Sequence, residues 1–134
     1  MNDTSDIQAR IQARMDENGH LTCQAAHLIA GELEADPLYV GDQATVIGAR
    51  IVRCQLGFFG YAEKKGMPGY KIVRKLDSVP QAVAAAVRQA ARDGKISCAA
   101  LWEIGHAQGI SRLDMGNVVE TLGLKVRPCQ LGCF

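Results

Sequence analysis

Cysteine is the residue type in this sequence whose positions point most clearly to chemistry. The chain has five cysteines, and two of them, Cys23 and Cys98, stand at the start of predicted helices. Free amide groups and the helix dipole at such a position lower the pKa of a thiol. Cys54 and Cys129 lie in extended segments further along the chain. If Cys23 approaches Cys54 and Cys98 approaches Cys129, the two pairs could form a thiolate metal site, an iron–sulfur site or a redox couple. Further ligands would come from Cys133, His27 and His106.

Packing is the competing explanation of the cysteines, and it is the one we favour. Cysteine is among the most buried residue types and suits tight contacts between a helix and a strand. The sequence contains no Cys-x-x-Cys spacing, which would indicate a metal site strongly. We therefore expect no metal and no cofactor. Cys133 is the most specialised of the five, because the matching position holds Phe58.

Four of the cysteines recur as pairs because the chain is an internal tandem duplication. An offset of 75 residues aligns the segment 19–23 with 94–98 and the segment 54–59 with 129–134, without a gap between them. The copies span residues 5–59 and 80–134, and each ends in Cys-Gln-Leu-Gly-x-Phe. Such a repeat gives two examples of every structural element. We divide the chain into a first unit, residues 1–76, and a second unit, residues 77–134.

Each copy carries the sequence signals of three helices. We expect helices at about 6–17, 23–33 and 37–48 in copy one, and at about 79–92, 98–108 and 112–123 in copy two. Side-chain caps are expected at helix starts from Thr22, Asp36, Ser78, Ser97 and Ser111. In copy two, Gly109 supplies the left-handed conformation that a tight turn between helices favours. Copy one has Glu34 at this position, so we expect its turn to be built differently.

A strand pattern follows the third helix. Residues 50–56 alternate in polarity, and in copy one a loop leads to a second alternating segment, 70–74, so we expect a hairpin. The fold class is therefore mainly α with small β hairpins. Helix, short strand, helix, turn, helix and hairpin is an order that resembles the winged helix-turn-helix fold, in two tandem units. Copy two stops at Phe134 without a complete wing, and such an open sheet edge invites cover by the other copy or by a second chain, so a homodimer is one expectation.

The resemblance implies a DNA-binding protein, with a role in transcriptional control and double-stranded DNA as the partner. Gln43, Thr45 and Asn117 lie where such families place their recognition helices, and an amide side chain there could read adenine. Asp42 and Glu120 would repel phosphate. Basic residues, which would contact phosphates, gather on the predicted strands and wing: Arg50, Arg53, Lys64, Lys65, Lys71, Arg74, Lys125 and Arg127.

Two alternatives stay open beside DNA binding: a non-enzymatic module that binds a protein, and a thiol-based metal or redox sensor. The formal charge of +1 gives no overall field that would select a nucleic acid or a membrane surface. The sequence has no phosphate loop and no nucleophile with an identifiable base, so we expect no enzyme. The polar N-terminus lacks a secretory signal and no apolar run would span a membrane, so we expect a cytoplasmic protein.

Overall fold

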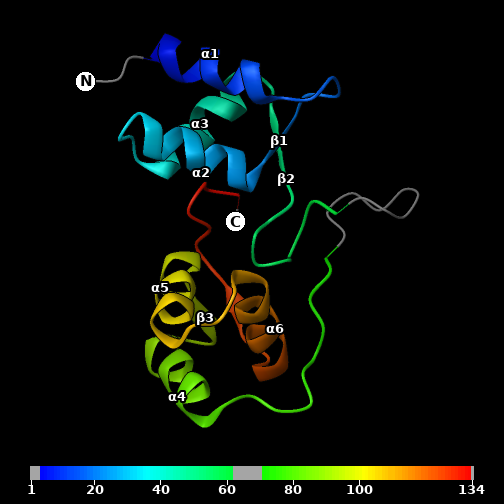
Figure 1. Cartoon of the computed structure of the whole chain (residues 1–134), viewed down its shortest axis with the longest axis vertical. Coiled ribbons are helices and arrows are strands. Elements are labelled where there is room, and N and C mark those ends of the chain that lie inside the picture. Colours follow the sequence, from blue (N-terminus) through cyan, green and yellow to red (C-terminus); the bar gives the residue numbers. More distant parts are fainter. Residues whose placement is uncertain (1–3, 62–70, 134) are drawn as a thin grey trace.

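The structure, a computed structural model, describes residues 4–61 and 71–133 and is mainly helical with short strand pairs (Figure 1). The same order of elements occurs in both copies. Copy one contains α1 (Thr4–Arg14), β1 (His20–Thr22), α2 (Cys23–Glu32), α3 (Pro37–Val46) and β2 (Arg50–Val52). Copy two contains α4 (Gln81–Ala90), β3 (Lys95–Ile96), α5 (Cys98–Gln108), α6 (Arg112–Leu122) and β4 (Lys125–Val126).

The strands pair in parallel, so the predicted hairpins are wrong for the described residues. β1 pairs with β2 and β3 pairs with β4, in registers that the duplication relates: His20 faces Arg50, and Lys95 faces Lys125. Residues 71–74 belong to no strand. Their backbone donors are used elsewhere, because the N–H of Ile72 donates to the carbonyl of Gly57 at 2.8 Å. Tyr70, where we expected the return strand to begin, lies outside the described residues.

Side-chain caps set the starts of four helices as predicted. The hydroxyl oxygens of Thr22 and Ser97 accept the N–H groups of Ala25 and Ala100 at 3.0 and 3.1 Å. Asp36 and Ser111 cap α3 and α6 in the same way. The cap predicted at Ser78 is wrong, since α4 begins at Gln81 and follows Pro80 without a side-chain cap. A proline disfavours the helical conformation in the residue before it, so the helix cannot extend back to Ser78.

The turn between the second and third helices is also the same in both copies, which corrects our expectation for Glu34. Gly109 has φ 69°, and Glu34 has φ 51°, so both are left-handed. The same hydrogen bond follows each turn: Ala35 N–H donates to Ala30 and Ile110 N–H donates to Gly105, both at 2.8 Å. Glutamate accepts this conformation at a cost of about 1 kcal/mol relative to glycine.

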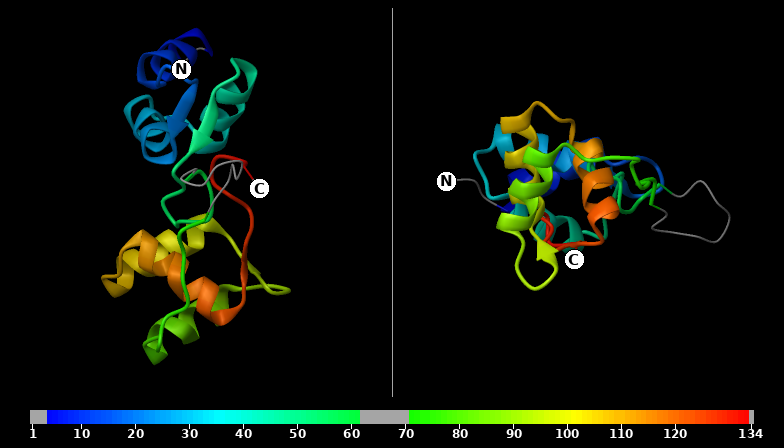
Figure 2. Two further views of the ribbon diagram at one scale, coloured as in Figure 1. Left: turned by 90° about the vertical axis from the view of Figure 1, so that its right-hand side faces the viewer. Right: turned by 90° about the horizontal axis from the view of Figure 1, so that it is seen from below.

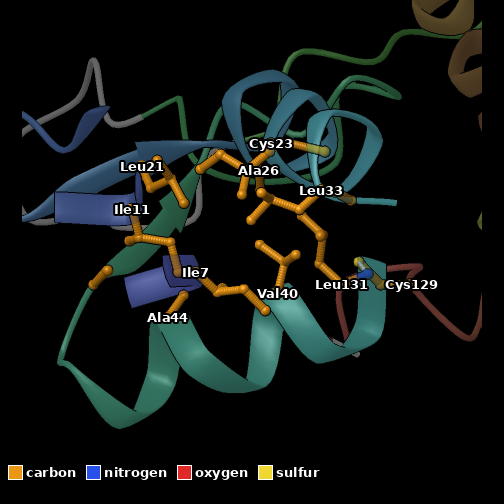
Figure 3. Close-up of a cluster of buried hydrophobic side chains, with 13 residues drawn as sticks. Ile7, Ile11, Leu21, Cys23, Ala26, Leu33, Val40, Ala44, Cys129 and Leu131 are labelled. Carbon is orange, nitrogen blue, oxygen red and sulfur yellow. Dashed lines mark hydrogen bonds between the residues drawn. The ribbon is translucent and has the colours of Figure 1, made fainter. Parts of the chain in front are cut away.

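The hydrophobic cores show that the two copies exchange segments. The core of copy one packs α1, α2 and α3 together, and Cys129 and Leu131 from the end of copy two complete it. The core of copy two is completed by Cys54 and Leu56 from copy one. We call residues 54–56 and 129–131 the crossing segments, and both lie between the two groups of helices (Figures 1 and 2). Figure 3 shows Leu131 reaching towards Val40. Each copy therefore depends on the other for part of its buried apolar surface.

A glycine in the third helix makes room for each crossing segment. A Cβ atom on Gly41 would overlap the carbonyl oxygen of Leu131, and a Cβ atom on Gly116 would overlap that of Leu56. The exchange is therefore reciprocal and relates the copies by an approximate two-fold. It explains why both copies have glycine at a position where alanine would favour the helix.

Among the described residues, no helix is long and apolar enough to cross a membrane.

Candidate functional site

The junction between the copies brings the cysteines together from four separate segments. Gln55 donates from Nε2 to the sulfur of Cys23 at 3.8 Å, and Gln130 donates to the sulfur of Cys98 at 3.4 Å. Cys129 interacts electrostatically with the cysteines at 23, 54 and 98. Cys133 is exposed and the other four cysteines are buried. The pairs that the sequence suggested, Cys23 with Cys54 and Cys98 with Cys129, interact electrostatically. Each core nevertheless joins cysteines from different copies, Cys23 with Cys129 and Cys54 with Cys98.

Burial controls the acidity of three of these thiols, which corrects our expectation for the helix starts. Burial raises the pKa of Cys23 to about 11 and that of Cys98 to about 12. It also raises the pKa of Cys54. Loss of water around a charged sulfur therefore outweighs the favourable position at a helix N-terminus. These thiols stay protonated at neutral pH, as packing residues do.

Cys129 differs because a second thiol lies beside it. A hydrogen bond from Cys133 lowers the pKa of Cys129 to about 6, and neighbouring backbone N–H groups add to the effect. One of them, that of Leu131, lies 3.4 Å from the sulfur. Cys54 receives similar backbone N–H groups but has Phe58 in place of the second thiol. Within residues 4–61 and 71–133, no group of three or more His, Cys, Asp or Glu side chains is arranged to hold a metal ion.

Two equivalent aromatic positions also meet at the junction. The rings of His27 on α2 and Trp102 on α5 have centroids 4.4 Å apart. The guanidinium carbon of Arg112 lies 3.6 Å from the centroid of Trp102, and its Nη1 donates to Gln55 at 2.6 Å. Burial lowers the pKa of His27 to about 4, and the positive charge of Arg112 contributes. His27 is therefore neutral at pH 7 and serves as a packing group between the copies.

The surface of α6 that a DNA-binding protein would present is covered by residues 71–76. Asn117 is 8% exposed, its side-chain oxygen accepts the N–H of Arg74 at 2.9 Å, and its amide donates to Asp114 at 3.2 Å. Thr121 accepts the N–H of Leu76 at 2.8 Å. The Nζ of Lys71 lies 2.7 Å from a carboxylate oxygen of Glu120. Asn117 thus has its hydrogen bonds satisfied within the chain.

The candidate residues of copy one remain more accessible. Gln43 accepts a hydrogen bond from Gln8 at 2.9 Å, and the hydroxyl of Thr45 donates to the carbonyl of Gly41 at 3.2 Å. Arg50 is exposed at the start of β2. The guanidinium of Arg53 lies 5.9 Å from the centroid of the Tyr61 ring. Lys64 and Lys65 lie outside the described residues.

The remaining basic candidates divide between separate places. Lys71, Lys125 and Arg127 border one open cavity of about 500 Å³, together with Phe58 and the partner of Lys71, Glu120. Arg53 borders a different cavity of about 370 Å³, near Arg14. The side chain of Arg74 belongs to the covering segment and is exposed. The structure therefore unites three of the predicted phosphate contacts and separates them from Arg53.

The third helix of copy one presents a surface that sequence reasoning overlooked. We define the α3 face as Leu38, Asp42, Thr45 and Val46, and the α6 face as the equivalent residues Leu113, Asn117, Glu120 and Thr121. Val46 is 68% exposed and Leu38 is 47% exposed. In the described part of the chain, no segment takes the place on α3 that residues 71–76 take on α6. The usable signal was the difference between the copies, where Asp42 replaces Asn117 and Val46 replaces Thr121.

Comparison with other proteins gives no further guide to these surfaces. No protein-family model, no curated protein and no solved structure matches this chain.

Proposed function

We propose that this chain is a non-enzymatic protein-interaction module that binds its partner through the α3 face. One observation carries the proposal: the same helix surface is covered in copy two and exposed in copy one. On α6, hydrogen bonds and an ion pair hold the covering segment in place. On α3, Val46 extends into solvent from the position equivalent to Thr121.

The energetics favour a partner on this face. Transfer of an exposed valine or leucine side chain into a protein contact contributes about 1.5 to 3 kcal/mol when the burial is complete. Asp42 is exposed and takes part in no ion pair among the residues that the structure describes. An acidic group flanked by apolar side chains suits a partner with apolar and basic residues, because the charges attract and set the orientation.

Site-specific photo-crosslinking in cells tests the proposal. A photoreactive residue at position 46 is expected to form an adduct with a defined protein, which mass spectrometry identifies. The same residue at position 28 is the matched control, since Leu28 on α2 is also an exposed apolar side chain, 54% accessible. Addition of the Asp42→Ala change should reduce the adduct at position 46. No adduct at 46 beyond that at 28 would reject protein binding through this face.

DNA binding by tandem winged-helix-like units is the second candidate. The observation in its favour is the approximate two-fold between the helix pairs α2–α3 and α5–α6, since dimeric helix-turn-helix proteins bind DNA as two-fold pairs. The carboxylate of Asp42 on α3 and the occupied hydrogen bonds of Asn117 oppose it. Copy one would therefore supply the contacts, through Gln43, Thr45 and Arg50.

A gel-shift titration with genomic fragments separates the two candidates. DNA binding predicts a shift at low salt that weakens steeply as salt rises, because phosphate contacts release counterions. It also predicts that Arg50→Ala weakens the shift. A shift that is absent at low salt would leave protein binding as the function, whereas a shift that Arg50→Ala does not weaken would place the DNA contacts elsewhere than at Arg50.

A further inference from the structure

The way residues 71–76 lie on α6 is a template for what the α3 face can hold. The N–H of Ile72 donates to the carbonyl of Gly57 at 2.8 Å, that of Arg74 to Asn117 at 2.9 Å, and that of Leu76 to Thr121 at 2.8 Å. Every second backbone donor thus points to the helix and to the adjacent turn. This spacing is that of an extended segment, in which alternate residues face the same way.

One side chain of the covering segment fits against two glycines. A Cβ atom on Gly57 would lie 3.0 Å from Cγ1 of Val73, and one on Gly116 would lie 3.1 Å from the same atom. Val73 therefore occupies a shallow notch that exists because neither glycine has a side chain. A β-branched residue suits such a notch, since its two γ positions fill the width beside an extended backbone.

The α3 face has the counterparts of these features. Gly41 and Gly132 are the counterparts of Gly116 and Gly57. Gly41 lies against the carbonyl of Leu131 as Gly116 lies against that of Leu56. Gly132 lies against the side chain of Leu38 as Gly57 lies against that of Leu113. Asp42 stands at the position of Asn117, where its exposed carboxylate is able to accept a backbone N–H. Val46 stands at the position of Thr121 and offers an exposed apolar side chain in place of the hydroxyl that accepts the N–H of Leu76.

We propose that the α3 face binds an extended segment of a partner protein in the manner of residues 71–76 on α6. This inference rests on the proposed protein-binding function and specifies its partner. A β-branched side chain lies in the notch of Gly41 and Gly132, and the next backbone N–H donates to the Asp42 carboxylate. A basic residue at that next position suits the negative charge, as Arg74 follows Val73 in the template.

The charges of the two faces support this choice of occupant. The α6 face pairs Glu120 with Lys71 of its covering segment. The α3 face has Thr45 at that position and carries its carboxylate at Asp42 instead, which is also the proposed acceptor for the backbone N–H. The favoured basic residue therefore moves along the segment, from the position of Lys71 to that of Arg74. A charge-assisted bond from a backbone N–H to a carboxylate is also stronger than one to an amide.

The probe for this inference is a capped, dye-labelled peptide with the sequence of residues 71–76, titrated into the full chain. The tethered segment holds the α6 face, because its effective concentration is on the order of millimolar. The peptide is expected to bind the α3 face. Val46→Lys should weaken it at least tenfold, whereas Leu28→Lys should leave it unchanged. Failure to bind at millimolar peptide, or equal binding to the Val46→Lys variant, would overturn the inference.

Backbone methylation of the peptide tests the extended geometry itself. Methylation of the nitrogen that corresponds to Arg74 removes the N–H for Asp42 and should weaken binding at least tenfold. Methylation at the position of Lys75, which faces away from the helix in the template, is the matched control. If the two methylated peptides bind equally, the extended mode is wrong. Crosslinks at position 46 would then still support protein binding, so the two proposals fail separately.

Sedimentation of the free chain addresses a second copy as the occupant. The inference expects no association that depends on the α3 face. A dimer that dissociates on the Val46→Lys change would instead make this face an interface between copies of the chain, and would overturn the partner proposed here.

Discussion

The α3 and α6 faces have descended from one surface, and they now differ in what covers them. On α6, a neighbouring segment satisfies Asn117 and Thr121 and pairs with Glu120. On α3, the same positions hold Asp42, Val46 and Thr45, and all three are exposed. Side chains changed to suit these two environments, while the glycine beneath each face did not. The buried side of each helix is constrained by the segment of the other copy that packs against it. The outer side has no such constraint and can differ between the copies.

The largest effect is expected where the two copies are still identical. Gly41→Ala and Gly116→Ala should each lower the free energy of unfolding by about 3 kcal/mol, because the added methyl overlaps a backbone carbonyl that cannot move cheaply. Gly31→Ala on α2 is the control, as no atom lies within 4 Å of its added methyl. It should stabilise the helix by about 0.5 to 1 kcal/mol. Denaturant unfolding measures the stability of all three variants. If Gly31→Ala changed the free energy of unfolding as much as the other two, the close packing of the crossing segments against Gly41 and Gly116 would be wrong.

A smaller effect should distinguish the two outer faces directly. Asn117→Ala removes the acceptor for Arg74 from a buried position and should destabilise the chain by about 2 kcal/mol. The equivalent change, Asp42→Ala, should alter stability by less than about 0.5 kcal/mol, because that side chain is exposed. Thermal and denaturant unfolding provide the comparison. A similar loss for both variants would mean that α3 is covered as α6 is.

Acid should weaken the junction through His27, whose equivalent Trp102 does not titrate. Its folded pKa of about 4 lies below the ordinary value of 6.5, so the unfolded chain binds the proton more readily. Stability is therefore complete above pH 6.5 and declines as pH falls towards 4. We expect a loss of about 1 kcal/mol near pH 5, after allowance for solvent screening at this partly exposed ring. In His27→Phe this component of the pH dependence should vanish; its persistence would assign it to other groups.

The turns offer a reciprocal pair of substitutions. Glu34→Gly should raise the free energy of unfolding by about 1 kcal/mol, and Gly109→Glu should lower it by about the same amount. Both residues are left-handed, and neither the cap nor the following hydrogen bond depends on their side chains. If Glu34→Gly destabilised the chain, its side chain would have to make a contact that compensates for the strain.

The sulfur sites should differ in acidity with little change in stability. Cys133→Phe copies the arrangement of Cys54 and Phe58, and it removes the hydrogen bond that lowers the pKa of Cys129. We expect the unchanged chain to show a thiolate absorbance whose titration is shifted to low pH, and we expect Cys133→Phe to remove that shift. Because residue 133 is exposed, unfolding should change by less than about 0.5 kcal/mol. Retention of the acidic titration would place its origin in the backbone N–H groups alone.

Local signals in the sequence predicted the local structure well, and failed where a distant segment intervenes. Thr22, Asp36, Ser97 and Ser111 cap helices because the hydroxyl or carboxylate reaches an amide within three residues. The hairpin was wrong because the N–H groups of Arg74 and Leu76 bond to α6 and that of Ile72 bonds to Gly57, so none of them pairs with a strand. No local pattern in the sequence records these partners.

The site was predictable only in part, for the same reason. The matched cysteines do lie near enough to interact electrostatically. Their acidity, however, depends on burial at the junction, which the position of Cys23 and Cys98 at helix starts does not reveal. The segment Cys-Gln-Leu-Gly has the same apolar pattern whichever core receives it. Leu38 and Val46 have the spacing of buried helix positions, and their exposure follows from the absence of a covering segment on α3.

The reciprocal insertion of Leu56 and Leu131 has a consequence for how the chain responds to dilution. A single copy with this architecture could close its core only by exchanging ends with another molecule, so its folding would depend on concentration. Joining two copies in one chain makes that association intramolecular. The fused molecule keeps its cores closed at any concentration. In a dimer of identical chains every substitution would appear in both copies, whereas in the fused chain each copy can change by itself.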